Sequence, residues 1–147
     1  MKKTDKYWQP LNEQLGFALY VCSKEIIKSY KPHLDPYNLT YTQYIAMQVL
    51  WENEIISFKD MGNILHLDSG TLTPLIKRLE KRGLLRRVTN SEDERSIDIE
   101  LLPAGKELYD KLPPLTERIM ENCNSTFDET NTLRDQLWAL LEKIHRN

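Results

Sequence analysis

Cysteine, histidine and long apolar runs are all scarce in this chain of 147 residues. The two cysteines, Cys22 and Cys123, are far apart and the three histidines are scattered, so the spacings of a disulfide framework or a structural zinc site are missing. No apolar run approaches the roughly 18 residues of a membrane span, and the first ten residues lack the apolar core of a signal peptide. We therefore expect a cytoplasmic protein without a metal, a cofactor or a membrane anchor.

Glycine is also rare, with five residues, while apolar residues recur at helical spacing over long segments. Hydrophobic residues make up 40% and charged residues 29% of the chain, which is ordinary for a globular protein and argues against disorder. A chain of this length can bury a core without disulfides or metal. We therefore expect a mainly helical protein of one domain, or one domain with an extension for dimerisation.

Positive charge is concentrated in one segment of a chain whose net charge is −2. Residues 69–87 hold six basic side chains and one acidic side chain, a net charge of +5, which leaves −7 for the remainder. This asymmetry indicates either a local face that binds a polyanion or a solvated helix with ion pairs along it. Charge alone does not separate these two interpretations.

Periodicity predicts helices over residues 11–34, 40–51, 57–67, 69–82 and 130–145, and another that begins at 103 and is interrupted by Pro113 and Pro114. Residues suited to helix ends support these bounds: Thr40 with Gln43, Ser57, either Asp68 or Ser69, and Gly83. Pro74 removes one backbone donor near the start of its helix, where the loss can be tolerated. Residues 84–88 and the alternating segment 97–101 predict a hairpin with a charged turn.

The order helix, helix, basic helix, hairpin is that of a winged helix-turn-helix, so we expect a mainly α fold with a small β-hairpin. In this arrangement the basic helix is the recognition helix, and its N-terminal residues meet base edges in the major groove of DNA. Ser69, Thr71 and Thr73 offer small polar groups at that place, and Gly70 permits close approach of the backbone. The pattern therefore predicts a DNA-binding function.

Basic side chains around this helix are candidates for the DNA backbone and the minor groove. Phosphate contacts are expected from Lys77 and Arg78, while Lys81 and Arg82 are equally well explained as solvated charges. Arg95 lies at the hairpin tip, where an arginine can enter the minor groove. Asp93, two residues earlier, is positioned to hold that guanidinium in a fixed pose.

Two motifs resemble those of MarR-type transcriptional regulators, and within them the organic-hydroperoxide and SarZ-like branch. They are `LDSGTLTPLIKRLEKRGL` and the wing `EDERSIDIELLPAGKEL`, and with `NEQLGFALYVCSKEI` and `YKPHLDPYNLTYTQY` the resemblance covers about residues 11–112. It implies one domain over residues 1–147, with dimerisation helices in 11–35 and 103–147 and the winged helix-turn-helix in 36–102. It also implies an obligate homodimer that represses transcription from a pseudo-palindromic operator in double-stranded DNA.

The resemblance and the pattern together give one set of predicted DNA-binding residues. They are Ser69, Gly70, Thr71, Thr73, Pro74, Lys77, Arg78, Arg87, Asp93 and Arg95. Of these, the resemblance implies that Ser69, Thr71, Thr73, Lys77 and Arg78 face the major groove and that Asp93 and Arg95 belong to the wing.

The chain departs from the peroxide-sensing relatives at the position of their reactive cysteine. Those relatives carry a pattern like L-C-F-x-L-Y in the first helix, whereas this chain reads `LGFALY`, which places Gly16 at the sensor position. The tyrosines that surround the sensor in relatives correspond to Tyr20, Tyr30 and Tyr41. Two explanations stay open for Gly16: close helix packing at a dimer interface, or a cavity that admits an apolar or phenolic effector.

Cys22 is the nearest alternative thiol, but it lies six positions, or about 9 Å, further along the helix. It falls on the apolar stripe, which favours an inert core residue. A redox role with Cys123 of the partner subunit as the resolving thiol is the other interpretation. A peroxide or a small molecule is thus expected as effector, at a site that includes Gly16, Tyr20, Cys22, Tyr30 and Tyr41.

Two other classes of function compete with the regulator, for which we expect no enzymatic activity. A thiol peroxidase using Cys22 and Cys123 is disfavoured because neither cysteine lies at an obvious helix N-terminus or beside a basic cluster. A winged-helix module that binds proteins would present an apolar recognition helix, whereas this helix presents Ser, Thr, Lys and Arg.

Overall fold

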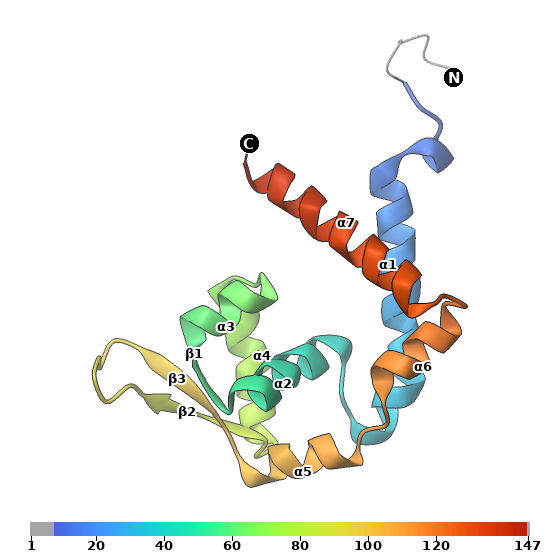
Figure 1. Cartoon of the computed structure of the whole chain (residues 1–147). Coiled ribbons are helices and arrows are strands. Elements are labelled where there is room, and N and C mark those ends of the chain that lie inside the picture. Colours follow the sequence, from blue (N-terminus) through green and yellow to red (C-terminus); the bar gives the residue numbers. More distant parts are fainter. Residues whose placement is uncertain (1–7, 147) are drawn as a thin grey trace. The chain divides into compact units, whose positions relative to one another are not determined.

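The computed structural model describes residues 8–146 of the chain (Figure 1). The first seven residues, on which the expectation of no signal peptide partly rests, lie outside this range. The α-helices are α1 (Leu15–Leu34), α2 (Tyr41–Asn53), α3 (Phe58–Leu65), α4 (Ser69–Lys81), α5 (Pro103–Lys111), α6 (Leu115–Asn122) and α7 (Phe127–His145). The strands are β1 (Ile55–Ser57), β2 (Leu85–Thr89) and β3 (Ile97–Leu101), and the short 3-10 helices are η1 (Leu11–Glu13) and η2 (Asp35–Tyr37).

The chain divides into two compact units, and each is described by itself. One comprises the residues up to Tyr30 and those from Pro114 onward; the other is Lys31–Pro113. The second unit, here called the winged unit, contains a three-stranded antiparallel sheet in the order β1-β3-β2. Figure 1 shows β2 and β3 extending from its helices as a hairpin. The mainly helical fold with a wing is thereby confirmed.

The core of the winged unit is formed by apolar faces of α2, α4 and the sheet. Residues without exposed surface include Met47 and Leu50 of α2, Ile76 of α4, and Leu85 and Ile99 of the hairpin. In the sheet register, Ile99 of β3 pairs with Arg87 of β2 and with Ile56 of β1. The sheet thus fixes the wing against the helices that carry the candidate site.

Local capping chemistry sets most helix ends in the winged unit. The Thr40 side chain accepts from the backbone N–H of Gln43, whose side chain in turn accepts from the backbone of Thr40, so the predicted capping box is confirmed. Ser57 caps α3 and Asp68 caps α4. Gly83 has a φ of 73°, the left-handed conformation expected just beyond a helix end.

Four details differ from the sequence prediction. The first helix was predicted from residue 11, but α1 begins at Leu15, and Leu11–Glu13 form the separate 3-10 helix η1. β1 was not predicted: it has only three residues, too few for a visible alternation, and forms because β3 provides its hydrogen-bonding partner. The strand predicted at 84–88 is shifted by one residue. The last helix begins at Phe127 rather than near 130, because Thr126 and Glu129 form a second capping box.

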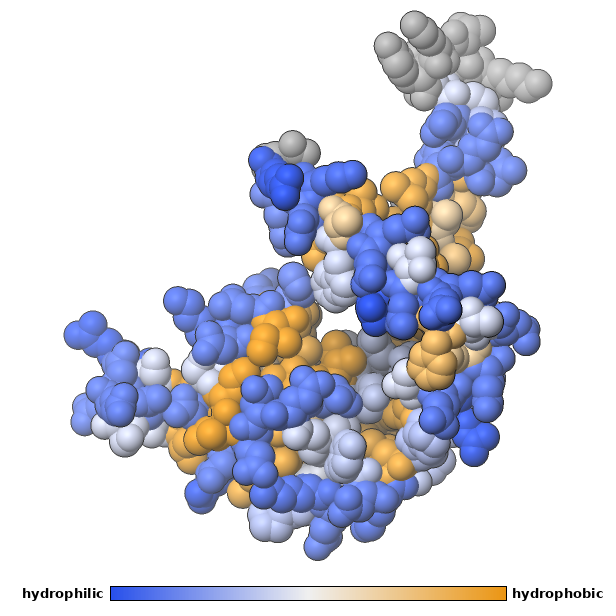
Figure 2. All heavy atoms as spheres, in the orientation of Figure 1, coloured by the Kyte–Doolittle hydropathy of each residue, from blue (hydrophilic) through white to orange (hydrophobic). Residues whose placement is uncertain are grey.

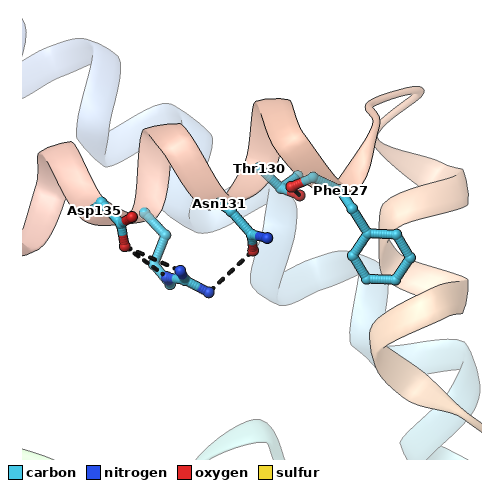
Figure 3. A network of polar contacts seen from close by, with 5 residues as sticks. Phe127, Thr130, Asn131 and Asp135 are labelled. Atoms are coloured by element: carbon cyan, nitrogen blue, oxygen red, sulfur yellow. Dashed lines mark hydrogen bonds and ion pairs between the residues drawn. The ribbon is translucent and has the colours of Figure 1, made fainter.

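In the other unit, apolar side chains remain at the surface of α1 and α7 (Figure 2). On α1 they include Leu15, Phe17 and Tyr20, and on α7 they include Leu133, Leu137, Trp138 and Ile144. A polar face also runs along α7, where the Arg134 guanidinium donates to the side chains of Asn131 and Asp135 (Figure 3). α7 is therefore amphipathic, and its apolar side is not covered within the described residues.

No described helix is both long and apolar enough to cross a membrane. Likewise, within residues 8–146 no group of three or more His, Cys, Asp or Glu side chains is arranged to hold a metal ion.

Candidate nucleic-acid interface

The helix-turn-helix is formed by α3, a tight turn and α4. α3 ends at His66, which adopts a left-handed conformation with φ 54°. The backbone N–H of Leu67 then donates to the Gly62 carbonyl at 3.0 Å. A side chain at position 62 would lie 3.0 Å from the Leu67 carbonyl oxygen, so the turn requires a small residue there. This turn positions Asp68 at the start of α4.

α4 has one buried and one exposed face. Its buried side chains are Leu72, Leu75, Ile76 and Leu79. The opposite face presents Ser69, Gly70, Thr71, Pro74, Lys77 and Arg78 as exposed residues and Thr73 as half-buried. Pro74 lies inside the continuous helix, as predicted. The structure thus places every predicted major-groove residue of α4 on its solvent side except Thr73, which is partly covered.

Asp68 stabilises the N-terminal end of α4. Its carboxylate accepts from the backbone N–H of Thr71 at 2.8 Å, and bonds from Thr71 and Gly70 lower the pKa of that carboxyl below its ordinary value. A negative charge is also favourable at the positive end of a helix dipole. The N-terminal residues of α4, which the sequence predicts to meet DNA bases, are therefore held by a charged cap.

We expect the thermal stability to depend on pH through Asp68. Its lowered pKa means that the stabilisation is fully present above the unfolded value of 3.8 and is lost as pH falls through the folded value. Asp68→Asn keeps a capping side chain but removes the charge. The difference in Tm between wild type and Asp68→Asn should therefore be largest near neutral pH and vanish below the folded pKa. A Tm difference that stays constant with pH would contradict this.

The wing tip is ordered by side chains that bond to its own backbone. The Asn90 Oδ1 atom accepts from the backbone N–H groups of Glu92 and Asp93, and the backbone N–H of Asn90 donates to the Ser96 carbonyl. Asp93 accepts from the backbone N–H of Arg95 at 3.0 Å. This corrects the expectation that Asp93 holds the Arg95 guanidinium. Asp93 fixes the backbone, and among described residues the guanidinium makes no ion pair.

Arg87, predicted to bind DNA, is instead engaged by Glu80 of α4. The Glu80 carboxylate accepts from the Arg87 backbone N–H at 2.8 Å and from its Nε and Nη2 atoms at 3.1 and 2.9 Å. These bonds, with the charge of Arg87, lower the pKa of the Glu80 carboxyl. The pair joins the recognition helix to the stem of the wing. Arg87 can therefore turn to a phosphate only by giving up bonds within the protein.

Lys81 and Arg82, which the sequence left undecided, differ in the structure. The Arg82 guanidinium donates to the backbone carbonyls of Tyr37 and Asn38, at 2.9 and 2.6 Å. Lys81 is exposed and makes no ion pair with any residue in 8–146. Sequence reasoning missed the roles of Glu80, Arg82 and Tyr37, because the partners are on different elements and leave no local pattern.

The predicted effector residues are not gathered within either unit. Gly16, Tyr20, Cys22 and Tyr30 belong to α1 in the first unit, while Tyr41 begins α2 in the winged unit. Apart from its chain neighbours and its own helix backbone, no heavy atom of the described residues lies within 4 Å of the position that a Gly16 side chain would take, and Tyr20 is exposed. Burial raises the pKa of the Tyr41 hydroxyl.

Both cysteines are exposed in this chain. The expectation that Cys22 is a core residue is therefore wrong for the chain by itself. The apolar stripe of α1 that carries Cys22 lies at the surface of the chain. The helical spacing therefore identified an apolar face correctly, but that face is not part of the core of the single chain.

Comparisons with known proteins agree with this architecture. A family model described as transcriptional regulator SarA/Rot matches residues 28–112. An organic hydroperoxide resistance transcriptional regulator of Bacillus subtilis is 43% identical over 136 residues, covering 92% of each chain. The HTH-type transcriptional regulator SarZ of Staphylococcus epidermidis is 40% identical over 133 residues, covering 90% of each.

Among solved structures, overoxidized AbfR of Staphylococcus epidermidis bound to DNA is similar, with a TM-score of 0.74 and 31% identity. The similarity covers 91% of this chain and 93% of that chain. Both the sequence relatives and the fold therefore match over most of the length. The chain belongs to the MarR-type winged-helix transcriptional regulators, in the branch of the organic-hydroperoxide and SarZ regulators.

Proposed function

We propose that this regulator binds a pseudo-palindromic operator in double-stranded DNA as a homodimer and represses transcription there. The observation that carries the proposal is the exposed face of α4, which presents small polar residues at its N-terminal end and basic residues behind them. AbfR, whose structure is similar over most of the chain, has been solved bound to DNA, which supports the proposal. Because the proposed partner is DNA and the relatives are transcriptional regulators, we also propose that the protein acts in the cytoplasm.

The contacts divide by the chemistry of the side chains. The side chains of Ser69, Thr71 and Thr73 are short. They therefore contact the edges of bases that lie directly against the N-terminal end of the helix. Lys77 and Arg78 lie one to two turns later and reach the phosphates that flank the groove. Phosphate neutralisation releases counterions, and binding should therefore weaken steeply as salt rises.

Dimerisation is proposed through the apolar faces of α1 and α7. Contiguous exposed apolar side chains are uncommon on monomers and mark interaction surfaces. Here they line α1 and α7 in the first unit (Figure 2). A homodimer buries them and also supplies two recognition helices, which a pseudo-palindrome requires.

For control of binding we propose an effector site on α1 around Gly16, Tyr20, Cys22 and Tyr30. The first mechanism is reaction of the Cys22 thiol with a peroxide; this thiol is exposed in the single chain and lies on the stripe of α1 that the proposed dimer covers. The open space at Gly16 favours a small ligand beside the tyrosines. These are two mechanisms, and one experiment separates them.

The test is selection of bound sequences from a random duplex pool. It is run with reduced protein, with protein treated with an organic hydroperoxide, and with Cys22→Ser as the matched variant. An enriched palindrome supports the proposed function, and the absence of any enriched duplex contradicts it. Loss of the palindrome on oxidation in wild type but not in Cys22→Ser assigns the switch to that thiol. Retention in both directs the search to a ligand near Gly16.

A further inference from the structure

A backbone turn between α1 and α2 accepts two hydrogen bonds from the end of the recognition helix. The turn consists of η2 and Asn38, which closes it in the left-handed conformation with φ 54° and ψ 45°. Arg82 is the residue directly after α4. Its Nη2 group donates a hydrogen bond to the Tyr37 carbonyl, and its Nη1 group donates one to the Asn38 carbonyl. The C-terminal end of α4 is therefore attached to this turn at two points.

The same turn is attached to the end of α5. The Tyr37 hydroxyl donates to the backbone carbonyl of Lys111 at 2.7 Å, and Lys111 is the last residue of α5. Helix ends leave carbonyl groups without partners inside the helix, so Tyr37 satisfies one that the fold leaves open. Tyr37 and Arg82 thus join three segments that are far apart in sequence: the turn before α2, the end of α4 and the end of α5.

The location of this junction within the winged unit gives it a functional meaning. The unit begins at Lys31 and ends at Pro113, so the chain enters it shortly before the turn and leaves it shortly after Lys111. Leu34 and Leu39, on either side of the turn, are buried and anchor it in the core. The recognition helix is therefore bonded to the points where the winged unit connects to the rest of the chain.

Arginine is chemically suited to this position and lysine is not. A guanidinium presents several N–H groups in one plane and can reach two carbonyls at once, whereas an ammonium is a point charge on a flexible chain. The two carbonyls of residues 37 and 38 are adjacent and both are used. Arg82 is thereby committed to the protein backbone, which sets it apart from the neighbouring exposed Lys81.

We propose that Arg82 and Tyr37 are positioning residues that set the spacing between operator half-sites. This inference rests on the proposed function, because it concerns a dimer on DNA. In a dimer, the separation of two recognition helices depends on how firmly each is fixed to the segments that lead to the dimerisation helices. One extra base pair moves a half-site by about 3.4 Å along the duplex axis, so only a firmly held helix discriminates against it.

The experiment compares wild type with Arg82→Lys and Tyr37→Phe on three duplexes. One is the operator selected by wild type, and the others have its centre lengthened or shortened by one base pair. Wild type should bind the duplex with the selected spacing more tightly than the other two. In each variant this ratio of affinities should fall about fivefold, which corresponds to the free energy of one ordinary hydrogen bond. Arg82→Lys keeps the charge, so its salt dependence of binding should equal that of wild type.

Lys81→Gln and Tyr109→Phe are the matched controls. Lys81 is the adjacent exposed base, and Tyr109 is an exposed tyrosine on α5. Both controls should retain the spacing preference of wild type. Lys81→Gln removes a charge, so a changed salt slope with unchanged spacing preference is the signature of a phosphate contact there.

A measurement without DNA tests the junction itself. The backbone N–H of Leu39 donates to the Leu34 carbonyl across the turn, and its hydrogen exchange should be faster in Arg82→Lys than in wild type. Unchanged exchange together with unchanged spacing preference in both variants would overturn the inference and leave the proposed function standing. If wild type binds no duplex, the proposed function and this inference fail together. Circular dichroism of each variant excludes loss of folding as the cause.

Discussion

Gly105→Ala should lower the free energy of unfolding by about 1–3 kcal/mol, the range found when an extra methyl or methylene group is forced into a packed core. Gly105 is buried in α5, and an alanine Cβ there would lie closer than 3.0 Å to the Leu84 carbonyl oxygen and to the Leu101 Cδ1 atom. The carbonyl cannot move away easily, because it accepts from the Leu102 backbone N–H at 3.0 Å. α5 is also held from its other side, where Trp51 Nε1 donates to the Gly105 carbonyl at 2.9 Å.

Chemical denaturation followed by circular dichroism measures this effect at fixed protein concentration. Gly16→Ala is the matched control, since Gly16 is also helical, but apart from its chain neighbours and its own helix backbone no described heavy atom lies within 4 Å of the new methyl group. Alanine is the better helix former by about 0.5–1 kcal/mol, so that variant should gain stability as long as no partner subunit packs there. An unchanged unfolding midpoint for Gly105→Ala would show that α5 shifts away from the hairpin without cost.

Helix ends were predictable from the sequence because their chemistry is local. Thr40 with Gln43, Ser57 and Gly83 each act within a few residues of their own position, and all occur as expected. The exposed face of α4 was predictable for the same reason, since helical periodicity separates Leu72 and Leu75 from the polar side. Local rules therefore account for the recognition helix and its cap.

The contacts between elements were not predictable, because they depend on how distant segments meet. Nothing in the sequence indicates that Arg82 reaches the carbonyl of Asn38, or that Gly105 faces the carbonyl of Leu84. The Glu80–Arg87 pair likewise depends on where β2 leaves the helix. As a result, the sequence did not indicate which of the six basic side chains in 69–87 are bonded within the protein, whereas the structure shows such bonds for Arg82, Arg86 and Arg87.

Arg95→Ala should weaken binding to the selected operator about tenfold or more at fixed salt, comparable to the loss of one good specific contact. Asn90 and Asp93 hold the backbone of the tip, so Arg95 projects from an ordered turn. Binding in a groove should therefore require little further ordering of the backbone. The loss should be largest on operators whose flanks are rich in A·T pairs, where the minor groove is narrow and strongly negative. Titration of labelled duplexes in gel shift or fluorescence anisotropy measures it.

Arg87→Ala is the informative comparison for Arg95→Ala. The Arg87 guanidinium is already bonded to Glu80. Compared with Arg95→Ala, Arg87→Ala should therefore reduce the affinity for the operator less and destabilise the wing stem more. Equal loss of affinity in both variants would mean that Arg87 leaves Glu80 on binding. Unchanged affinity in Arg95→Ala would show that the wing tip does not touch the operator.

Asp93 variants then distinguish two roles of this carboxylate: a hydrogen bond to the backbone of the tip, and an ion pair with the Arg95 guanidinium. Asp93→Asn retains an Oδ1 atom that can accept from the Arg95 backbone N–H, so this variant should bind the operator nearly as well as wild type. Asp93→Ala removes the acceptor and should loosen the tip, which would reproduce part of the Arg95→Ala loss. If Asp93 instead acted by holding the guanidinium through its charge, the Asn variant would lose as much affinity as the Ala variant. The geometry at the tip favours the first outcome, because the carboxylate is bonded to the chain and the guanidinium is left for DNA.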